Sequence, residues 1–141
     1  MDSDVSDEFW HGIDQFNRGE FYACHDTLEA IWIEAPTYEK KFFQGILQIA
    51  VSLYHLGNHN WRGAVILLGE GISRLNGYQP QYAGVDVEDL IDRAAQLLTQ
   101  LQTIGPDRVA QIVLALEPLP KSDAQIFLSR PIIQKADPSN E

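Results

Sequence analysis

Hydrophobic residues recur at helical spacing along most of the chain. Near the start, Phe9, Ile13 and Phe16 follow one another at i, i+4 and i+7, which places them on one face of a helix. Gly19 follows the last periodic position, where a glycine commonly ends a helix. The pattern predicts a first helix over about residues 7–17. A second helix follows almost at once, so the two are expected to form an antiparallel hairpin.

The stretch from residue 19 to residue 35 combines an apolar stripe with polar side chains. His25 and Glu29 are four residues apart at the edge of this stripe, beside Trp32, so the two side chains are expected to be neighbours and half in the core. Pro36 prevents the next helical turn, which ends the helix near Ala35. The stripe consists of Phe21, Cys24, Leu28, Ile31 and Ala35.

A third helix is predicted over about residues 37–56, with a broad buried face. Its remaining narrow face carries Gln44, Gln48, Ser52 and His55, with no charged residue beyond Lys41. Because a solvent face normally collects Lys and Glu, this neutral stripe indicates a covered surface or a cleft. The alternative is a lightly exposed face that happens to be neutral. The predicted buried face consists of Phe42, Phe43, Ile46, Leu47, Ile49, Ala50, Leu53 and Tyr54.

Three further helices follow. A fourth, beginning at Trp61, is expected to place Glu70 and Arg74 outward as an ion pair. Its glycines would be tolerated where another helix approaches closely; these are Gly63, Gly69 and Gly71. Residues 76–84 are expected to form a loop, and Asp86 to cap a fifth helix. A short sixth helix follows Gly105-Pro106. The fold class predicted is all-α, with five to six helices in packed antiparallel hairpins.

The expected organisation is one helical domain over residues 1–117, with its motifs in 10–75, and a strap or tail over 118–141. That last segment contains four of the seven prolines: Pro118, Pro120, Pro131 and Pro138. It is also apolar enough to dock on this domain or on a partner, through Ile126, Phe127, Leu128, Ile132 and Ile133.

Two helix starts resemble each other at a distance of 40 residues. A turn, an aromatic residue and a small residue three positions later occur as Gly19-Glu20-Phe21 with Cys24 and as His59-Asn60-Trp61 with Ala64. Helix-pair repeats of the tetratricopeptide kind pack adjacent helices with such residues. This similarity between the two helix starts favours stacked, tetratricopeptide-like hairpins.

Composition and charge exclude several classes of protein. With 45% hydrophobic and 21% charged residues the chain is globular, and its net charge of −10 disfavours nucleic-acid binding and adhesion to anionic membranes. One cysteine excludes an internal disulfide, and the acidic start lacks the features of a signal peptide, so a cytoplasmic location is expected. Residues 42–61 contain no Asp, Glu, Lys or Arg, but their amides and histidines are too polar for a membrane span.

These motifs resemble the bacterial and archaeal family catalogued as domain of unknown function 309. The first block of that family corresponds to Gly19, Phe21, Tyr22, His25, Glu29 and Trp32, and the second to Gln44, Gly45, Gln48, His55, Gly63 and Ala64. The chain departs from the family at Ala23, Cys24 and Asp26, where glutamate, alanine and glutamate are common. The resemblance covers about residues 10–75 and implies an all-α fold of packed hairpins, with no established activity.

Three functions are compatible with the polar residues of the second and third helices. The first is a module that binds a protein or small molecule in a site between these helices, lined by Tyr22, His25, Glu29, Trp32, Gln44, Gln48 and His55. The second is a purely structural hydrogen-bonded network of His25, Glu29, Gln44, Gln48 and His55. The third is a metal-dependent enzyme with His25, Glu29 and His55 as ligands.

Enzymatic chemistry is the least favoured of these classes. The chain has no glycine-rich phosphate loop, serine elbow or dinucleotide fingerprint, and its residues name no cofactor. Cys24 precedes His25, but adjacent helical residues point about 100° apart, so the imidazole is poorly placed to take the thiol proton. Cys24 is expected to be a small buried hydrophobic residue.

Overall fold

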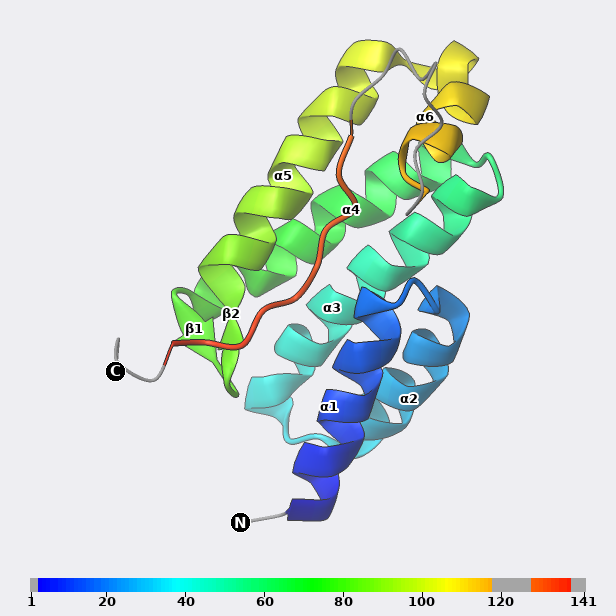
Figure 1. Ribbon diagram of the computed structural model, residues 1–141. Helices are drawn as coiled ribbons and strands as arrows, with labels where there is room; N and C mark the ends of the chain where they lie inside the picture. The colour runs from blue at the N-terminus through cyan, green and yellow to red at the C-terminus, as the bar shows by residue number, and fades with distance from the viewer. Residues whose placement is uncertain (1–2, 118–127, 138–141) are drawn as a thin grey trace.

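The computed structural model describes residues 3–117 and 128–137, and within these ranges the fold is all-α, as predicted (Figure 1). Its helices are α1 (Ser3–Asn17), α2 (Phe21–Glu34), α3 (Thr37–Gly57), α4 (Trp61–Leu75), α5 (Val87–Ile104) and α6 (Val109–Ala115). Single 3₁₀ turns lie at Asn76–Tyr78 and Pro106–Arg108. Asp86 caps α5 as expected, because its Oδ1 accepts a hydrogen bond from the amide of Asp89 at 3.0 Å.

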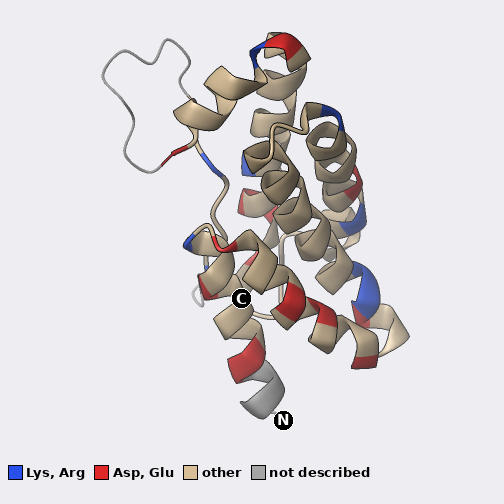
Figure 2. Cartoon of the chain, turned by 90° about the vertical axis from the view of Figure 1, so that its right-hand side faces the viewer, with Lys and Arg blue, Asp and Glu red and all other residues tan. Residues whose placement is uncertain are grey.

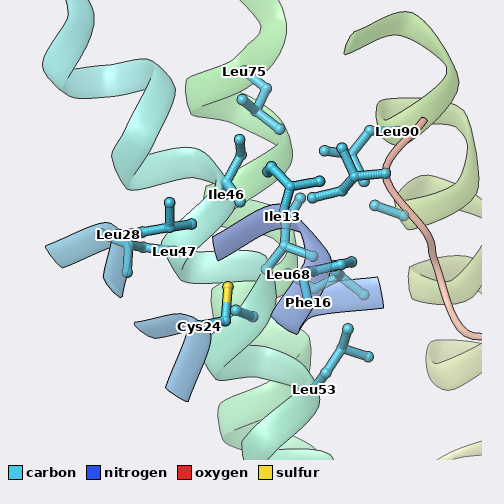
Figure 3. Packing of buried hydrophobic residues seen from close by; sticks show 14 of the residues in the cluster. Ile13, Phe16, Cys24, Leu28, Ile46, Leu47, Leu53, Leu68, Leu75 and Leu90 are labelled. Carbon is cyan, nitrogen blue, oxygen red and sulfur yellow. The ribbon is translucent and has the colours of Figure 1, made fainter. Parts of the chain in front are cut away.

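The helices pack largely in chain order, with α1 on α2, α2 on α3, α3 on α4 and α4 on α5 (Figure 1). Apolar side chains from all six helices meet in one core, which Figure 3 shows for Ile13, Leu28, Ile46, Leu68 and Leu90 of the first five. The predicted stripe of α1 is confirmed, since Phe9, Ile13 and Phe16 are all buried. Helical periodicity therefore identified the core face of α1 correctly.

Helix α3 lies at the centre of the bundle and carries most of the uncharged run of residues 42–61. Its buried face packs against both α2 and α4. Tyr54 is an exception to the predicted buried face, because it is 41% exposed. In the described ranges we find no helix that combines the length and the apolar character needed for a membrane span.

Helices α3 and α4 approach each other most closely at a pair of glycines. A Cβ on Gly71 would lie 2.8 Å from the carbonyl oxygen of Gly45, so the predicted close approach is confirmed there. It is wrong for the other two glycines of α4. The nearest atom to a Cβ on Gly69 would be Leu98 Cδ2 at 3.9 Å, and Gly63 lies against the side chain of its own cap, Asn60.

The two echoed helix starts have the same backbone conformation. Gly19 and His59 both have positive φ, of 83° and 63°, and the next residues, Glu20 and Asn60, have φ, ψ of −88°, 67° and −93°, 78°. The amides of these four residues bond to carbonyls at equivalent positions. The small residues that follow, Cys24 and Ala64, are both buried. The likeness in sequence thus reflects two equivalent interhelical turns.

Residues 76–84 are not entirely a loop. Strand β1 (Gln81–Tyr82) pairs antiparallel with β2 (Val85–Asp86) around Ala83 and Gly84, whose φ angles are 51° and 80°. Two consecutive positive φ angles are typical of a tight hairpin turn. The expectation missed this hairpin because alanine is rarely found in such a turn and each strand is only two residues long.

The segment 128–137, called the strap below, crosses from α5 to the β1–β2 hairpin (Figure 1). The side-chain amide of Asn17, at the end of α1, donates to the carbonyl of Ile133 at 2.9 Å and accepts from its N–H at 2.7 Å. The amide of Asp86 bonds to the carbonyl of Gln134, so the strap also holds β2. Ile133 is buried, and Leu128 and Ile132 are half-buried. The expectations for Ile126, Phe127, Pro118, Pro120 and Pro138 fall outside the described residues.

Candidate functional site

Four aromatic side chains gather on the outer side of α2 and α3. The ring of Tyr22 on α2 lies 5.4 Å from that of Tyr54 on α3, and these rings are 61% and 41% exposed. His25 follows Tyr22 along α2 with a ring distance of 6.2 Å, and His55 follows Tyr54 with 6.3 Å. We call Tyr22, His25, Tyr54 and His55 the aromatic cluster. It joins the two helices on their solvent side.

His25 lies between two carboxylates of its own helix. Its Nε2 is 3.4 Å from Glu29 Oε2 and its Nδ1 is 3.4 Å from Asp26 Oδ1. The His25 and Glu29 side chains are 35% and 45% exposed. The His25 and Glu29 side chains are therefore close together, as predicted. They lie at a solvent-exposed position, where an ion pair contributes little to stability.

Gln48 faces α4, not α2. Its side-chain nitrogen donates to Glu70 Oε1 at 3.1 Å, and its oxygen accepts from Arg74 Nε at 2.9 Å. The expected direct Glu70–Arg74 ion pair is thus replaced by two hydrogen bonds through the Gln48 amide. Gln44, one turn earlier, is half-buried and makes no hydrogen bond within the described residues. The predicted single network of His25, Glu29, Gln44, Gln48 and His55 is not formed.

Trp32 is fixed by Lys40 at the start of α3. The Lys40 ammonium lies 4.8 Å from the centre of the indole ring and donates to the carbonyls of Trp32 and Ile33 at 2.9 and 3.1 Å. The indole Nε1 is buried, and among the described residues it has no hydrogen-bond partner. Trp32 packs against the core and closes the end of α2, so its contacts are those of a structural residue.

His55 does not join His25 and Glu29 as a third metal ligand. Its Nδ1 lies 3.4 Å from the side-chain nitrogen of Asn60, in the turn between α3 and α4. Within the described ranges, the group with metal-ligand geometry is His25, Asp26 and Glu29, with one ligand atom from each within 4.8 Å of the others. The prediction of His55 as a ligand is wrong because its ring is turned toward Asn60 in the α3–α4 turn, while Asp26 is adjacent to His25.

The sequence interpretation missed Tyr54 and Asp26 as members of this surface. Tyr54 lies at the border of the apolar face of α3, where its ring can pack and its hydroxyl can reach water. That amphipathic character was the available signal. Asp26 lies on the solvent face of α2, and His25 is exposed enough to reach it.

Cys24 is fully buried beneath this surface, as expected. Burial raises the pKa of its thiol from 9.0 to about 12. Since the thiolate is the nucleophilic form, the protonated Cys24 thiol serves at neutral pH as a small core residue.

The fold and this surface define a class of small helical-hairpin proteins with an exposed group of tyrosine, histidine and carboxylate side chains. Residues 9–67 match the model of the family described as "Domain of unknown function (DUF309)", so the resemblance to that family is confirmed over this region. The match runs from α1 into α4 and includes the whole aromatic cluster.

A relative found among curated proteins is "Uncharacterized protein YpuF" of Bacillus subtilis (strain 168). It is 30% identical over 89 residues, which are 61% of this chain and 51% of that protein. The chain therefore spans about half the length of this relative.

Proposed function

We propose that the protein is a cytoplasmic binding module whose aromatic cluster, together with Glu29, binds a short basic polypeptide segment. The observation that carries this proposal is the stack of Tyr22 on Tyr54, because both rings are exposed and each comes from a different helix. Tyrosines held on rigid helices provide contact area with little loss of side-chain entropy, which is why they are enriched at binding hot spots.

The charge around the stack indicates the sign of the partner. Helix α2 carries Asp26, Glu29 and Glu34 and contains no Lys or Arg. Figure 2 views the molecule from the side on which α2 lies in Figure 1. The helix nearest the viewer is α2, and it carries acidic residues on successive turns. The whole chain has a net charge of −10, so the long-range field also attracts a basic segment. An arginine can both stack on a tyrosine ring and pair with a carboxylate.

A peptide-display selection against the untagged chain tests the proposal. Enriched peptides should carry Arg or Lys beside an apolar or aromatic residue. Their affinity, measured by fluorescence anisotropy, should fall roughly tenfold or more in the Tyr22→Ala variant, the usual effect of removing a hot-spot tyrosine.

The matched control is Tyr38→Ala. Tyr38 is 73% exposed at the start of α3, outside the cluster, and within the described ranges its side chain makes no hydrogen bond. This variant should keep the parent affinity within about twofold. Selection of acidic peptides, or equal losses in the two variants, would contradict the proposal.

A second candidate, a metal-dependent enzyme, is favoured by the group of His25, Asp26 and Glu29. Their ligand atoms lie within 4.8 Å of one another, and all three residues come from one exposed helix face, which would leave coordination positions open. Titration of the untagged chain with Zn²⁺, Mn²⁺ and Fe²⁺ tests this candidate. Binding at micromolar or tighter affinity that disappears in His25→Ala would support it, and lack of such binding would exclude it.

A further inference from the structure

The outer face of α2 carries an ordered row of side chains that extends beyond the aromatic cluster. Tyr22, Asp26, Glu29 and Ile33 follow one another at i, i+4, i+7 and i+11, so they lie within about 60° of one another around the helix. We call these four residues the α2 row. At 1.5 Å per residue the row is about 16 Å long, from the first turn of α2 to its last.

Both ends of the α2 row are apolar and exposed. Tyr22 is 61% exposed and Ile33 is 60% exposed, whereas Cys24 and Leu28 on the opposite face of the helix are fully buried. The ring of Tyr54 packs beside Tyr22 and enlarges that end of the row. A single exposed isoleucine is common on protein surfaces, but Ile33 lies on the same helix face as an exposed tyrosine, about three turns away. The row therefore offers two apolar contact points at a fixed separation.

Two carboxylates lie between these apolar ends. The side chains of Asp26 and Glu29 are 65% and 45% exposed, and each has one oxygen 3.4 Å from a ring nitrogen of His25. Within the described ranges neither carboxylate pairs with a lysine or an arginine, and α2 itself contains neither residue type. A complementary partner therefore needs basic side chains in the middle of its contact face and apolar side chains at both ends.

The spacing of the α2 row matches a helical partner better than an extended one. A helix laid along α2 presents one face with the same axial steps of about 6, 4.5 and 6 Å, so each residue of the row meets one partner residue. A strand presents side chains to one face about every 6.8 Å and is about 3 Å out of register at the third contact. The backbone groups in the middle of α2 are bonded within the helix, so an extended segment finds none to pair with, whereas a helix satisfies its own.

We infer that the polypeptide partner is an amphipathic helix that lies along α2 and contacts the whole α2 row. Its contact face carries two basic residues flanked by two apolar residues, at i, i+4, i+7 and i+11. The apolar residues pack on Tyr22 and Ile33, and the basic residues pair with Asp26 and Glu29. A second copy of α2 does not fit, because its carboxylates would face the same carboxylates here. This inference rests on the proposed function and restricts the partner to one conformation.

The test is titration of three synthetic peptides of equal length and net charge with the full chain, followed by fluorescence anisotropy. The aligned peptide places leucine, arginine, arginine and leucine at that spacing in a background of alanine and glutamine. The permuted peptide has the same composition, with these four residues distributed around the helix. The third is the aligned peptide with a central proline away from the contact face, which breaks the helix. We expect the aligned peptide to bind saturably and at least roughly tenfold more tightly than either of the others.

Ile33→Ala should weaken binding of the aligned peptide roughly fivefold or more, because one apolar end of the row is removed. The matched control is Ile66→Ala. Ile66 is 50% exposed on α4, outside the α2 row, and its replacement should change the affinity by less than about twofold. Both isoleucines are exposed, so neither substitution is expected to disturb the fold.

The inference is overturned if the three peptides bind equally, if none of them binds, or if Ile33→Ala binds the aligned peptide as the parent does. The proposed function fails separately, when peptide-display selection returns no basic peptide whose binding depends on Tyr22. Basic peptides that need Tyr22 but neither a helical conformation nor Ile33 would support the proposed function and exclude the helical partner.

Discussion

Gly71 of α4 lies against Gly45 of α3 so closely that a methyl group on Gly71 would be 2.8 Å from the Gly45 carbonyl oxygen and 2.8 Å from Ile49 Cγ1. The backbones of α3 and α4 are in contact at this point. The position of α4 on the central helix therefore depends on the absence of a side chain at Gly71. At Gly69, the neighbouring glycine of the same helix, a methyl group would make only an ordinary van der Waals contact, with Leu98 Cδ2 at 3.9 Å.

Gly71→Ala is therefore expected to destabilise the fold, although alanine favours the helical conformation. The added methyl group meets a backbone atom, which cannot move without shifting the helix, so we expect a loss of about 1–3 kcal/mol in the free energy of unfolding. Gly69→Ala should instead add about 0.5–1 kcal/mol, because it gains helix propensity without a clash. Urea denaturation of both variants measures the difference. Equal effects would mean that the glycine contact does not set the spacing of the helices.

Asn17→Ala is expected to release the strap from α1. The substitution removes both hydrogen bonds to Ile133 and should cost about 1–3 kcal/mol in unfolding free energy. Hydrogen–deuterium exchange of the Ile133 amide should accelerate, while exchange in the middle of α3 should change only with global stability. Asn58→Ala, at an exposed position after α3, is the control and should leave the strap protected. Unchanged exchange at Ile133 in Asn17→Ala would refute this role.

Cys24 is expected to resist thiol reagents in the folded chain. At pH 8 it should react at least roughly 1,000-fold more slowly than in the unfolded chain, because reaction requires opening of the core. The chain in denaturant, where its single cysteine is accessible, is the reference. Rapid modification of the native chain would show that the α1–α2 hairpin opens locally.

The pH dependence of Cys24 follows from the same burial. Its folded-state pKa of about 12 lies above the ordinary 9.0, so the contribution to stability is full below pH 9.0 and is lost as pH rises toward 12. Cys24→Ala should show a shallower loss of stability between these values in denaturation experiments.

His25→Ala is expected to change the free energy of unfolding by no more than about 0.5 kcal/mol at pH 7.5, as is usual for exposed positions. The imidazole is partly exposed and its two carboxylate neighbours reach water. Leu28→Ala, one turn further on the buried face of α2, is the contrast and should cost about 2–5 kcal/mol. A loss near 2 kcal/mol for His25→Ala would instead mean that the histidine holds the fold and would weaken the case for a binding role.

The helices were predictable because each carries its own periodic stripe and its own stop signal. Gly19 and Pro36 separate the first three helices, and Asp86 caps the fifth. The strap contacts were not predictable, since they pair Asn17 with Ile133, and nothing in either local sequence specifies the other. Such hydrogen bonds form only because the folded chain brings the two segments together.

The candidate site was predicted only in part, because contacts within one helix follow from the sequence spacing and contacts between helices do not. His25 and Glu29 share one helix, so their spacing alone makes them neighbours. Gln48 and His55 come from α3, which is apolar around most of its circumference. Periodicity does not reveal which helix covers each face of such an element. Gln48 consequently faces α4, and Tyr54 contacts Tyr22 on the outside.

The bond between Asn17 and Ile133 spans 116 residues, and this separation has a consequence for the order of events during synthesis. Domains acquire structure as the chain emerges, and contacts distant in sequence form late. The Asn17 amide leaves the ribosome long before its partner and bonds to water in the interval. In that interval the α1–α2 hairpin is held by its apolar packing and by polar contacts made without the strap, such as the hydrogen bond from the Thr27 hydroxyl to Gln15. The strap therefore docks onto the end of α1 after the helices have assembled.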